Sequence, residues 1–117
     1  MNEGLPRPTP PPERALADIL GLASRARGLV HGTDMTRKAV RDGEVKAVIL
    51  AVDASPTQMQ KLVPLLQARK IPFHVCLSRE VLGFAIGRGP VSAVGITNGS
   101  FAKRAAVLAA ALSSPQG

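Results

Sequence analysis

Hydrophobic positions near the start of the chain follow the period of a helix. From Glu13 onward they recur three and four residues apart. These positions are Leu16, Ile19, Leu20 and Ala23. Side chains at this spacing lie on one face of a helix and can be buried together. The pattern predicts an amphipathic first helix that begins at Glu13 and is ended by Gly28.

Four apolar runs between the helical patterns are typical of short strands. They cover residues 29–30, 45–52, 71–77 and 91–97. Residues 45–52 are nearly continuous in Val, Ile, Leu and Ala, as expected of a central strand covered on both faces. In residues 71–77 apolar positions alternate with Pro72, His74 and Cys76, which predicts a strand with proline near its beginning.

The other segments carry helix signals, and residues 33–41, 79–85 and 100–112 are predicted helices. A further helix begins after Ser55, where Pro56 suits the first helical position and Gln58 can complete a capping box. Pro64 is expected to bend or interrupt that helix. Ser78 can cap the short helix that follows it.

Helices and strands therefore alternate along the chain. This order predicts an α/β fold, a three-layer α/β/α sandwich with a central mixed sheet of about four strands. A length of 117 residues with 45% hydrophobic content suits one core. We expect a single domain over residues 13–112 and a flexible tail over residues 113–117. Residues 1–12 are proline-rich and are expected to be a flexible leader.

Charge adds a functional direction to this picture. The chain has 15 Lys and Arg against 8 Asp and Glu, a formal net charge of +7. Such an excess favours association with nucleic acid or another polyanion. The longest apolar stretch, residues 105–112, is far shorter than the roughly 20 residues that span a bilayer. With no secretory signal pattern either, we expect a soluble cytoplasmic protein without a membrane partner.

Residues able to support catalysis or metal binding are sparse. Cys76 is the sole cysteine, which excludes an internal disulfide and a cysteine-based zinc site within one chain, and it is expected to pack in the core. His31 and His74 are expected to be ordinary surface and sheet residues. The loop containing Arg88 lacks the Gly-Lys-Ser/Thr ending of a phosphate-binding P-loop. We expect no metal, no cofactor and no enzymatic activity.

The most informative segment is residues 25–43, R-A-R-G-L-V-H-G-T-D-M-T-R-K-A-V-R-D-G. Gly32 frees the backbone just before Thr33 and Asp34, either of which can cap the following helix. A helix N-terminus collects unpaired N–H donors and partial positive charge. Cations lie on both sides of it: Arg25, Arg27, Arg37, Lys38 and Arg41. The segment predicts a docking place for a polyanion.

Four motifs in order then carry a family resemblance. They are L-G-L-A-S-R-A-R-G-L-V-H-G-T-D-M-T-R-K-A-V-R-D-G, K-A-V-I-L-A-V-D-A-S-P, I-P-F and L-G-F-A-I-G-R-G-P-V-S-A-V-G-I. From about residue 16 to residue 106 the chain resembles the kink-turn RNA-binding ribosomal-protein superfamily, the L7Ae/L30e-like proteins, most closely its small bacterial YlxQ-like members. The resemblance implies an α/β/α sandwich that binds structured RNA and is not catalytic. The expected partner is a structured RNA, either ribosomal RNA, which would bring association with the ribosome, or a structured leader.

The resemblance also implies where RNA binds. The first place is the segment from Gly32 and Thr33 to Lys38, where archaeal and eukaryotic members carry Asn and Glu after Gly-Thr and read tandem G·A pairs. This chain has Asp34 and Met35 there. Lys38 can still reach a guanine edge or a phosphate, and Asp34 can accept from guanine N–H groups. Met35 cannot hydrogen-bond to a base.

The second implied place is the loop of residues 88–93, which in the family contacts a flipped-out nucleotide. Here it reads R-G-P-V-S-A. Val91, Ser92 and Ala93 are the expected base contacts, and the expected phosphate contacts are Arg25, Arg27, Arg37, Arg41 and Arg88. Shape and splayed nucleotides commonly determine RNA specificity. Aromatic stacking is not expected, because the chain has no Trp or Tyr and only three Phe.

Plainer interpretations remain open at this point. Asp34 and Lys38 are four residues apart and could form a surface ion pair, and Arg25 and Arg27 could only compensate a helix dipole. The basic face could serve a protein-interaction module that binds an acidic partner, or the chain could be the RNA-recognition domain of a modifying enzyme. Lys61 and Arg69, on the third predicted helix, are expected to lie away from the RNA site.

Overall fold

The computed structural model describes residues 11–112, in five helices and four strands. The elements are α1 Pro12–Arg25, β1 Leu29–His31, α2 Thr33–Arg41, β2 Ala47–Leu50, α3 Pro56–Ala68, β3 Phe73–Val75, α4 Arg79–Ala85, β4 Ala93–Ile96 and α5 Gly99–Leu112. The predicted tail and residues 1–10 of the predicted leader lie outside the described residues. Pro12, assigned to the leader, is the first residue of α1.

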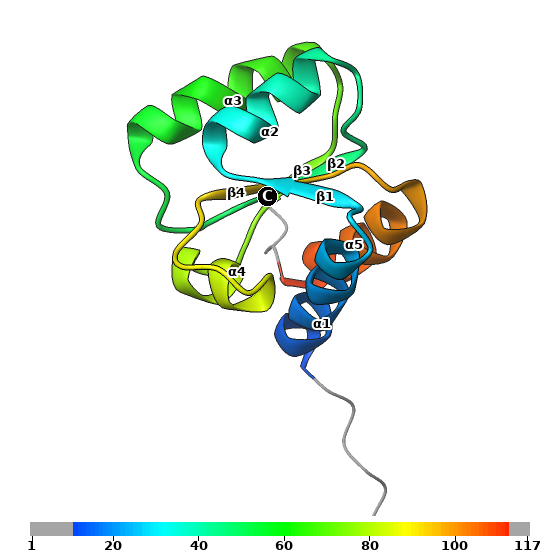
Figure 1. Ribbon diagram of the computed structural model, residues 1–117. Helices are drawn as coiled ribbons and strands as arrows, with labels where there is room; N and C mark the ends of the chain where they lie inside the picture. The colour runs from blue at the N-terminus through cyan, green and yellow to red at the C-terminus, as the bar shows by residue number, and fades with distance from the viewer. Residues whose placement is uncertain (1–10, 113–117) are drawn as a thin grey trace, which may run out of the picture.

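The four strands form one mixed sheet in the order β1-β4-β2-β3. β4 is antiparallel to both β1 and β2, whereas β2 and β3 are parallel. Helices α2 and α3 cover one face of the sheet, and α1, α4 and α5 cover the other (Figure 1). The predicted three-layer α/β/α sandwich is confirmed.

Each face of the sheet has its own core because neighbouring side chains of a strand point to opposite faces. In β2, Val48 and Leu50 pack toward α2 and α3, while Ala47 and Ile49 pack toward α1, α4 and α5. All four are buried, so β2 is a central strand as its apolar run predicted.

The strands are shorter than the apolar runs that predicted them. Leu77 has a φ of 65°, which turns the chain out of the sheet after β3. Val91 donates its backbone N–H to the Arg79 carbonyl and not to a neighbouring strand. Both side chains are buried all the same. The apolar runs are longer than the strands because apolar residues in the adjoining turns also face the core.

Helix α3 begins as predicted. The Ser55 hydroxyl accepts from the Gln58 N–H at 3.2 Å, and the Ser55 N–H donates to Gln58 Oε1 at 3.1 Å. The predicted interruption at Pro64 is wrong, because one helix continues through this residue. Pro64 is exposed, so the carbonyl that it leaves unbonded can be hydrated, while Leu62 and Leu66 anchor the opposite side.

No helix within residues 11–112 is both long and apolar enough to cross a membrane. Within the same residues, no three His, Cys, Asp or Glu side chains gather as metal ligands would. Cys76 is buried, and this burial raises the pKa of its thiol to about 11. It is a packing residue, as expected, and its thiol stays protonated near neutral pH.

Candidate nucleic-acid interface

The register of the sheet brings the two expected RNA-contacting segments together. β1 runs antiparallel to β4 with His31 opposite Val94. Directly after β1, the Gly32 N–H donates to the Ala93 carbonyl at 2.9 Å. The start of α2 therefore lies beside Ser92, although the two segments are far apart in the sequence.

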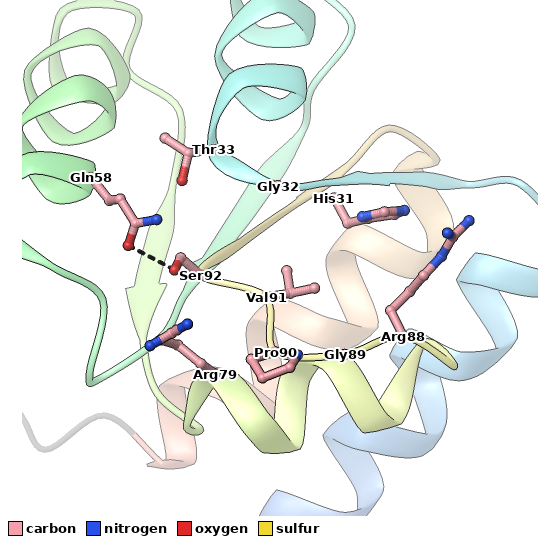
Figure 2. Close-up of a pocket in the computed structure, with 10 residues that line it drawn as sticks. All are labelled: His31, Gly32, Thr33, Gln58, Arg79, Arg88, Gly89, Pro90, Val91 and Ser92. Carbon is pink, nitrogen blue, oxygen red and sulfur yellow. Dashed lines mark hydrogen bonds between the residues drawn. The ribbon is translucent and has the colours of Figure 1, made fainter.

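Between these segments lies an open pocket of about 380 Å³, which we call the α2 pocket (Figure 2). Its walls come from the β1–α2 junction, the first turn of α3, the first residue of α4 and the loop before β4. The lining residues are His31, Gly32, Thr33, Gln58, Arg79, Arg88, Gly89, Pro90, Val91 and Ser92.

The N-terminus of α2 opens onto this pocket without a side-chain cap. Gly32 is the N-cap residue, with a φ of 92°, and no side chain accepts from the first turn. The prediction that Thr33 or Asp34 caps the helix is wrong, because the turn at Gly32 makes them the first two helical residues. The first helical hydrogen bond is from the Thr36 N–H to the Gly32 carbonyl. The N–H groups of Thr33, Asp34 and Met35 remain available to an anionic ligand.

A buried hydroxyl lies at the same place. Among the described residues, Thr33 Oγ1 is buried and has no hydrogen-bond partner. Figure 2 shows this oxygen on the pocket side of Thr33. A hydroxyl can donate one hydrogen bond and accept others, and leaving it buried and unpaired is costly. A ligand in the pocket could supply the partner that the folded chain lacks.

Gln58 connects α3 to the loop on the opposite wall. Its Oε1 accepts from the Ser55 N–H and from the Ser92 hydroxyl, the latter at 2.8 Å. These two donors fix the orientation of the amide, because an oxygen must stand where both bonds end. The Nε2 group is then left as a donor on the side of Thr33 (Figure 2).

The loop before β4 is held against α4. A Cβ at Gly83 would overlap the Gly89 carbonyl oxygen, and the Arg88 N–H donates to the Gly83 carbonyl at 2.7 Å. Gly83 thus permits the close approach of this loop. The side chains of Val91 and Ser92 are buried, and Ala93 is fully buried inside β4. Ala93 can offer a ligand only its backbone.

Cations surround the pocket unevenly. Arg79 and Arg88 line it directly. Arg37, Lys38 and Arg41 lie on the outer side of α2, together with the carboxylates of Asp34 and Asp42. Met35 is exposed on the same helix. The cations near the pocket therefore form two groups, one in the pocket and one along α2.

Arg25 is not brought to this place. It lies at the end of α1, on the other face of the sheet, in a groove with Leu22 and Phe84. Arg27 follows the end of α1 with a φ of 59°. Arg25 and Arg27 are close to Gly32 in the sequence, which suggested a shared site. In the structure, β1 lies between these arginines and Gly32 and leads the chain from the α1 layer to the α2 layer.

The ion pairs differ from the expected one. Lys38 Nζ is 2.9 Å from Asp42 Oδ2, and this hydrogen-bonded carboxylate raises the pKa of Lys38. Asp34 Oδ1 lies 3.7 Å from Lys61 Nζ. The suggested pair between Asp34 and Lys38 is wrong, because α3 lies alongside α2 and supplies Lys61 instead. All these groups are exposed, so the pairs add little to stability.

Lys61 and Arg69 are also closer to α2 than expected. The Lys61 carbonyl accepts from Arg37 Nε at 3.2 Å. Arg69 Nη1 donates to the carbonyls of Val40 and Arg41, at 3.3 Å each. The expectation that they lie away from the site is wrong. Lys103, exposed on α5 in the opposite layer, is a better reference position.

Three pocket residues, His31, Gln58 and Arg79, were not among the predicted site residues, and His31 was expected to be an ordinary surface residue. The capping box already explained Gln58 in the sequence. That local pattern gave no indication that Gln58 Oε1 would also accept a hydrogen bond from Ser92. Arg79 follows Ser78, whose hydroxyl caps α4 by accepting from the Val81 N–H at 3.1 Å. Gln58 and Arg79 both reach the pocket through contacts with the loop before β4, which is distant from Gln58 in the sequence and follows Arg79 only after α4.

The fold and this basic pocket define a small α/β/α module of the ribosomal-protein type. The model of the Ribosomal protein L7Ae/L30e/S12e/Gadd45 family matches residues 14–106, most of the chain. The chain belongs to this family.

Three curated relatives share this sequence pattern. RNA-binding protein YlxQ of Bacillus subtilis is 37% identical over 86 residues, which are 74% of this chain and 86% of that protein. Large ribosomal subunit protein eL8 of Picrophilus torridus is 28% identical over 74% of this chain and 68% of its own. The H/ACA ribonucleoprotein complex subunit nhp2 of Schizosaccharomyces pombe is 37% identical over 66% of this chain and 51% of its own.

Two solved structures share the fold. A Bacillus halodurans protein of unknown function superimposes with a TM-score of 0.78 and 36% identity, covering 81% of this chain and 96% of that one. The Giardia lamblia 15.5kD RNA binding protein superimposes with a TM-score of 0.72 and 19% identity, covering 92% of both chains. The second match shows the fold alone.

Proposed function

We propose that this chain is a non-catalytic RNA-binding protein that recognises a structured, sharply bent RNA through α2 and the α2 pocket. The observation that carries the proposal is the meeting of two distant segments, the open N-terminus of α2 and the loop of residues 88–92, around one basic hollow. Membership of the family and the RNA-binding relatives support it.

The two groups of cations suit two parts of a bent RNA. Arg37, Lys38 and Arg41 lie along the outer side of α2, where they can neutralise phosphates on either side of a bend. Each phosphate contact releases counterions, so the affinity should fall as salt rises. A straight duplex offers the same phosphates but cannot place them around one short helix as a bent RNA can.

The pocket suits an extruded nucleotide. Pro90 is exposed at its edge, and Val91 and Ser92 form a buried floor, so a base can rest on a small apolar surface. Gln58 Nε2 and Thr33 Oγ1 offer polar contacts on the other wall. Bases splayed out of a helix are the usual source of RNA specificity.

The first turn of α2 modifies the contacts that the family motif implies. Lys38 keeps a cation that can reach guanine or phosphate. Asp34 can accept from guanine N–H groups, and its carboxylate lies 3.7 Å from Lys61 Nζ. Met35 supplies an exposed apolar surface and no hydrogen bond. Recognition of tandem G·A pairs then depends on Asp34 and Lys38.

Three RNAs of equal length test the proposal at physiological salt. They are a kink-turn RNA, the same RNA with its tandem G·A pairs changed to Watson–Crick pairs, and a straight duplex. We expect the purified protein to bind the intact kink-turn most tightly. Equal weak binding to all three would overturn recognition of the bend and leave only attraction by charge. The proposal places the protein in the cytoplasm, with ribosomal RNA as the expected partner.

A further inference from the structure

The layer opposite α2 presents a continuous surface around α1. Ala15, Asp18, Leu22 and Arg25 follow one another at spacings of three, four and three, which places them along one side of the helix. Asp18 and Leu22 line two grooves at once, one shared with α4 and one shared with α5. This side of α1 is therefore a ridge between two grooves, which we call the α1 ridge.

Large apolar side chains stand on both sides of the ridge. Phe84 of α4 is 85% exposed and lines the first groove, while Val107 of α5 is 72% exposed and lines the second. Leu22 between them is 43% exposed. Single exposed apolar residues are common, but three that join through shared grooves form a patch of the kind that marks a protein contact.

The charges on the α1 ridge indicate which kind of partner can bind it. Asp18 lies four residues before Leu22 and Arg25 three residues after it, so the ridge carries one negative and one positive end. Within residues 11–112 neither side chain has an ion-pair partner. Arg104 of α5 adds an exposed cation to the second groove, outside the ridge itself. A surface with an apolar centre and opposite charges at its two ends is complementary to itself when turned around.

We propose that the α1 ridge is the contact surface for a second copy of this chain, in a twofold dimer with Leu22 at the axis and the two α1 helices antiparallel. Antiparallel helices crossing at Leu22 bring Asp18 of each copy beside Arg25 of the other. A parallel arrangement would instead place the two Asp18 carboxylates opposite each other, where like charges repel. Charge thus selects the antiparallel form.

The remaining parts of the surface fit the same symmetry. An axis that lies across α1 brings the two α4 edges together and the two α5 edges together. Phe84 then packs beside the partner's first groove, and Val107 beside the partner's second groove. Helices α2 and α3 cover the opposite face of the sheet, so both copies keep α2 open to solvent (Figure 1). The dimer goes beyond the proposed RNA binding and would offer two α2 surfaces to one RNA.

Sedimentation velocity of the full chain over micromolar to millimolar concentrations tests the dimer. We expect a rise from the monomer mass of 12.2 kDa toward twice that value as the concentration increases. Phe84→Glu should abolish the rise. Val52→Glu places the same charge at another exposed apolar site, 61% exposed in the turn after β2, and should leave it unchanged. A monomer at every concentration, or equal effects of both variants, would overturn the proposal.

Charge reversal tests the antiparallel register. Asp18→Arg and Arg25→Asp should each weaken the dimer, because each places like charges side by side. The double variant should restore it, since the two charges only exchange places. Both residues are exposed, so neither change disturbs the core. Failure of the double variant to recover would exclude this register.

A cross-link tests the position of the axis. With a short bis-maleimide, Leu22→Cys should join two copies efficiently, whereas Val52→Cys should not. Cys76 is buried and its thiol protonated, so the introduced thiol is the one that reacts. Equal yields from the two variants would contradict a twofold axis at Leu22. None of these measurements uses RNA, so their outcome is independent of the RNA titration.

Discussion

The two helical layers of this protein expose surfaces of opposite character. The α2 layer presents cations beside an uncapped helix N-terminus, where the Thr33 hydroxyl has no hydrogen-bond partner among the described residues. The α1 layer presents Leu22, Phe84 and Val107. Unsatisfied polar groups favour a polar, charged ligand, whereas exposed apolar groups favour a protein surface. This difference is the basis on which we propose RNA as the ligand of the α2 layer and a second copy of the chain as the partner of the α1 layer.

Helix α4 links the two layers. Phe84 is exposed and lines the groove beside the α1 ridge, while Gly83, the preceding residue, touches the loop that closes the α2 pocket. Arg79 at the start of the same helix lines that pocket. Substitutions at different residues of α4 can therefore test the α1 ridge and the α2 pocket separately.

The largest expected effect is that of Gly83→Ala. The new methyl group would overlap the Gly89 carbonyl, which is backbone and cannot rotate away. We expect the free energy of unfolding to fall by about 1–3 kcal/mol, as is usual for overpacking, and RNA binding to weaken because the loop must move. Urea denaturation and RNA titration measure the two effects.

Gly89→Ala is the matched control, because a Cβ there would meet no atom within 4 Å. It lies in the same loop and should change stability by less than about 0.5 kcal/mol. Equal losses from the two alanines would show that overlap with the Gly89 carbonyl is not the cause, and the contact between Gly83 and Gly89 would no longer explain the position of the loop.

The next prediction compares the two layers directly, in RNA binding and in dimerisation. Lys38→Ala should raise the dissociation constant for kink-turn RNA by about tenfold, whereas Lys103→Ala, which removes the same charge from α5, should change it by less than about threefold. Neither should alter dimerisation. Phe84→Glu should do the reverse, abolishing the dimer and leaving the RNA affinity of the monomer within a few-fold. Equal losses of RNA affinity from both lysines would mean that only net charge matters.

Local signals in the sequence predicted most of the fold. The capping box of Ser55 and Gln58, the N-cap at Ser78 and the apolar run of β2 each depend on neighbours within a few residues. The site depended on non-local pairing and was predicted only in part. Arg25 was grouped with Gly32 because the sequence does not show that β1 lies between them and leads from one layer to the other. Arg79 was missed because it reaches the α2 pocket through contacts with Val91 and Asp53, both far from it in the sequence.

A smaller effect concerns the two buried hydroxyls of α2. Thr36 is fully buried beneath the helix, so Thr36→Val removes an unpaired polar group and keeps the shape of the side chain. We expect the free energy of unfolding to rise by about 1 kcal/mol with RNA affinity unchanged. Thr33→Val should also stabilise the fold but weaken RNA binding, because its hydroxyl faces the α2 pocket. Equal RNA affinities of the two variants would exclude Thr33 from the interface.

The smallest expected effect is that of Asp42→Asn. In the free protein Lys38 is held by Asp42 at 2.9 Å, so RNA must compete with this carboxylate for the same ammonium group. Removing the negative charge frees Lys38 and reduces repulsion of phosphates, so the affinity for kink-turn RNA should rise modestly, by less than Lys38→Ala lowers it. In the Lys38→Ala background the gain should shrink, since only the general repulsion remains. A full gain without Lys38 would show that Asp42 acts by repelling phosphates and that its pair with Lys38 has no part in binding.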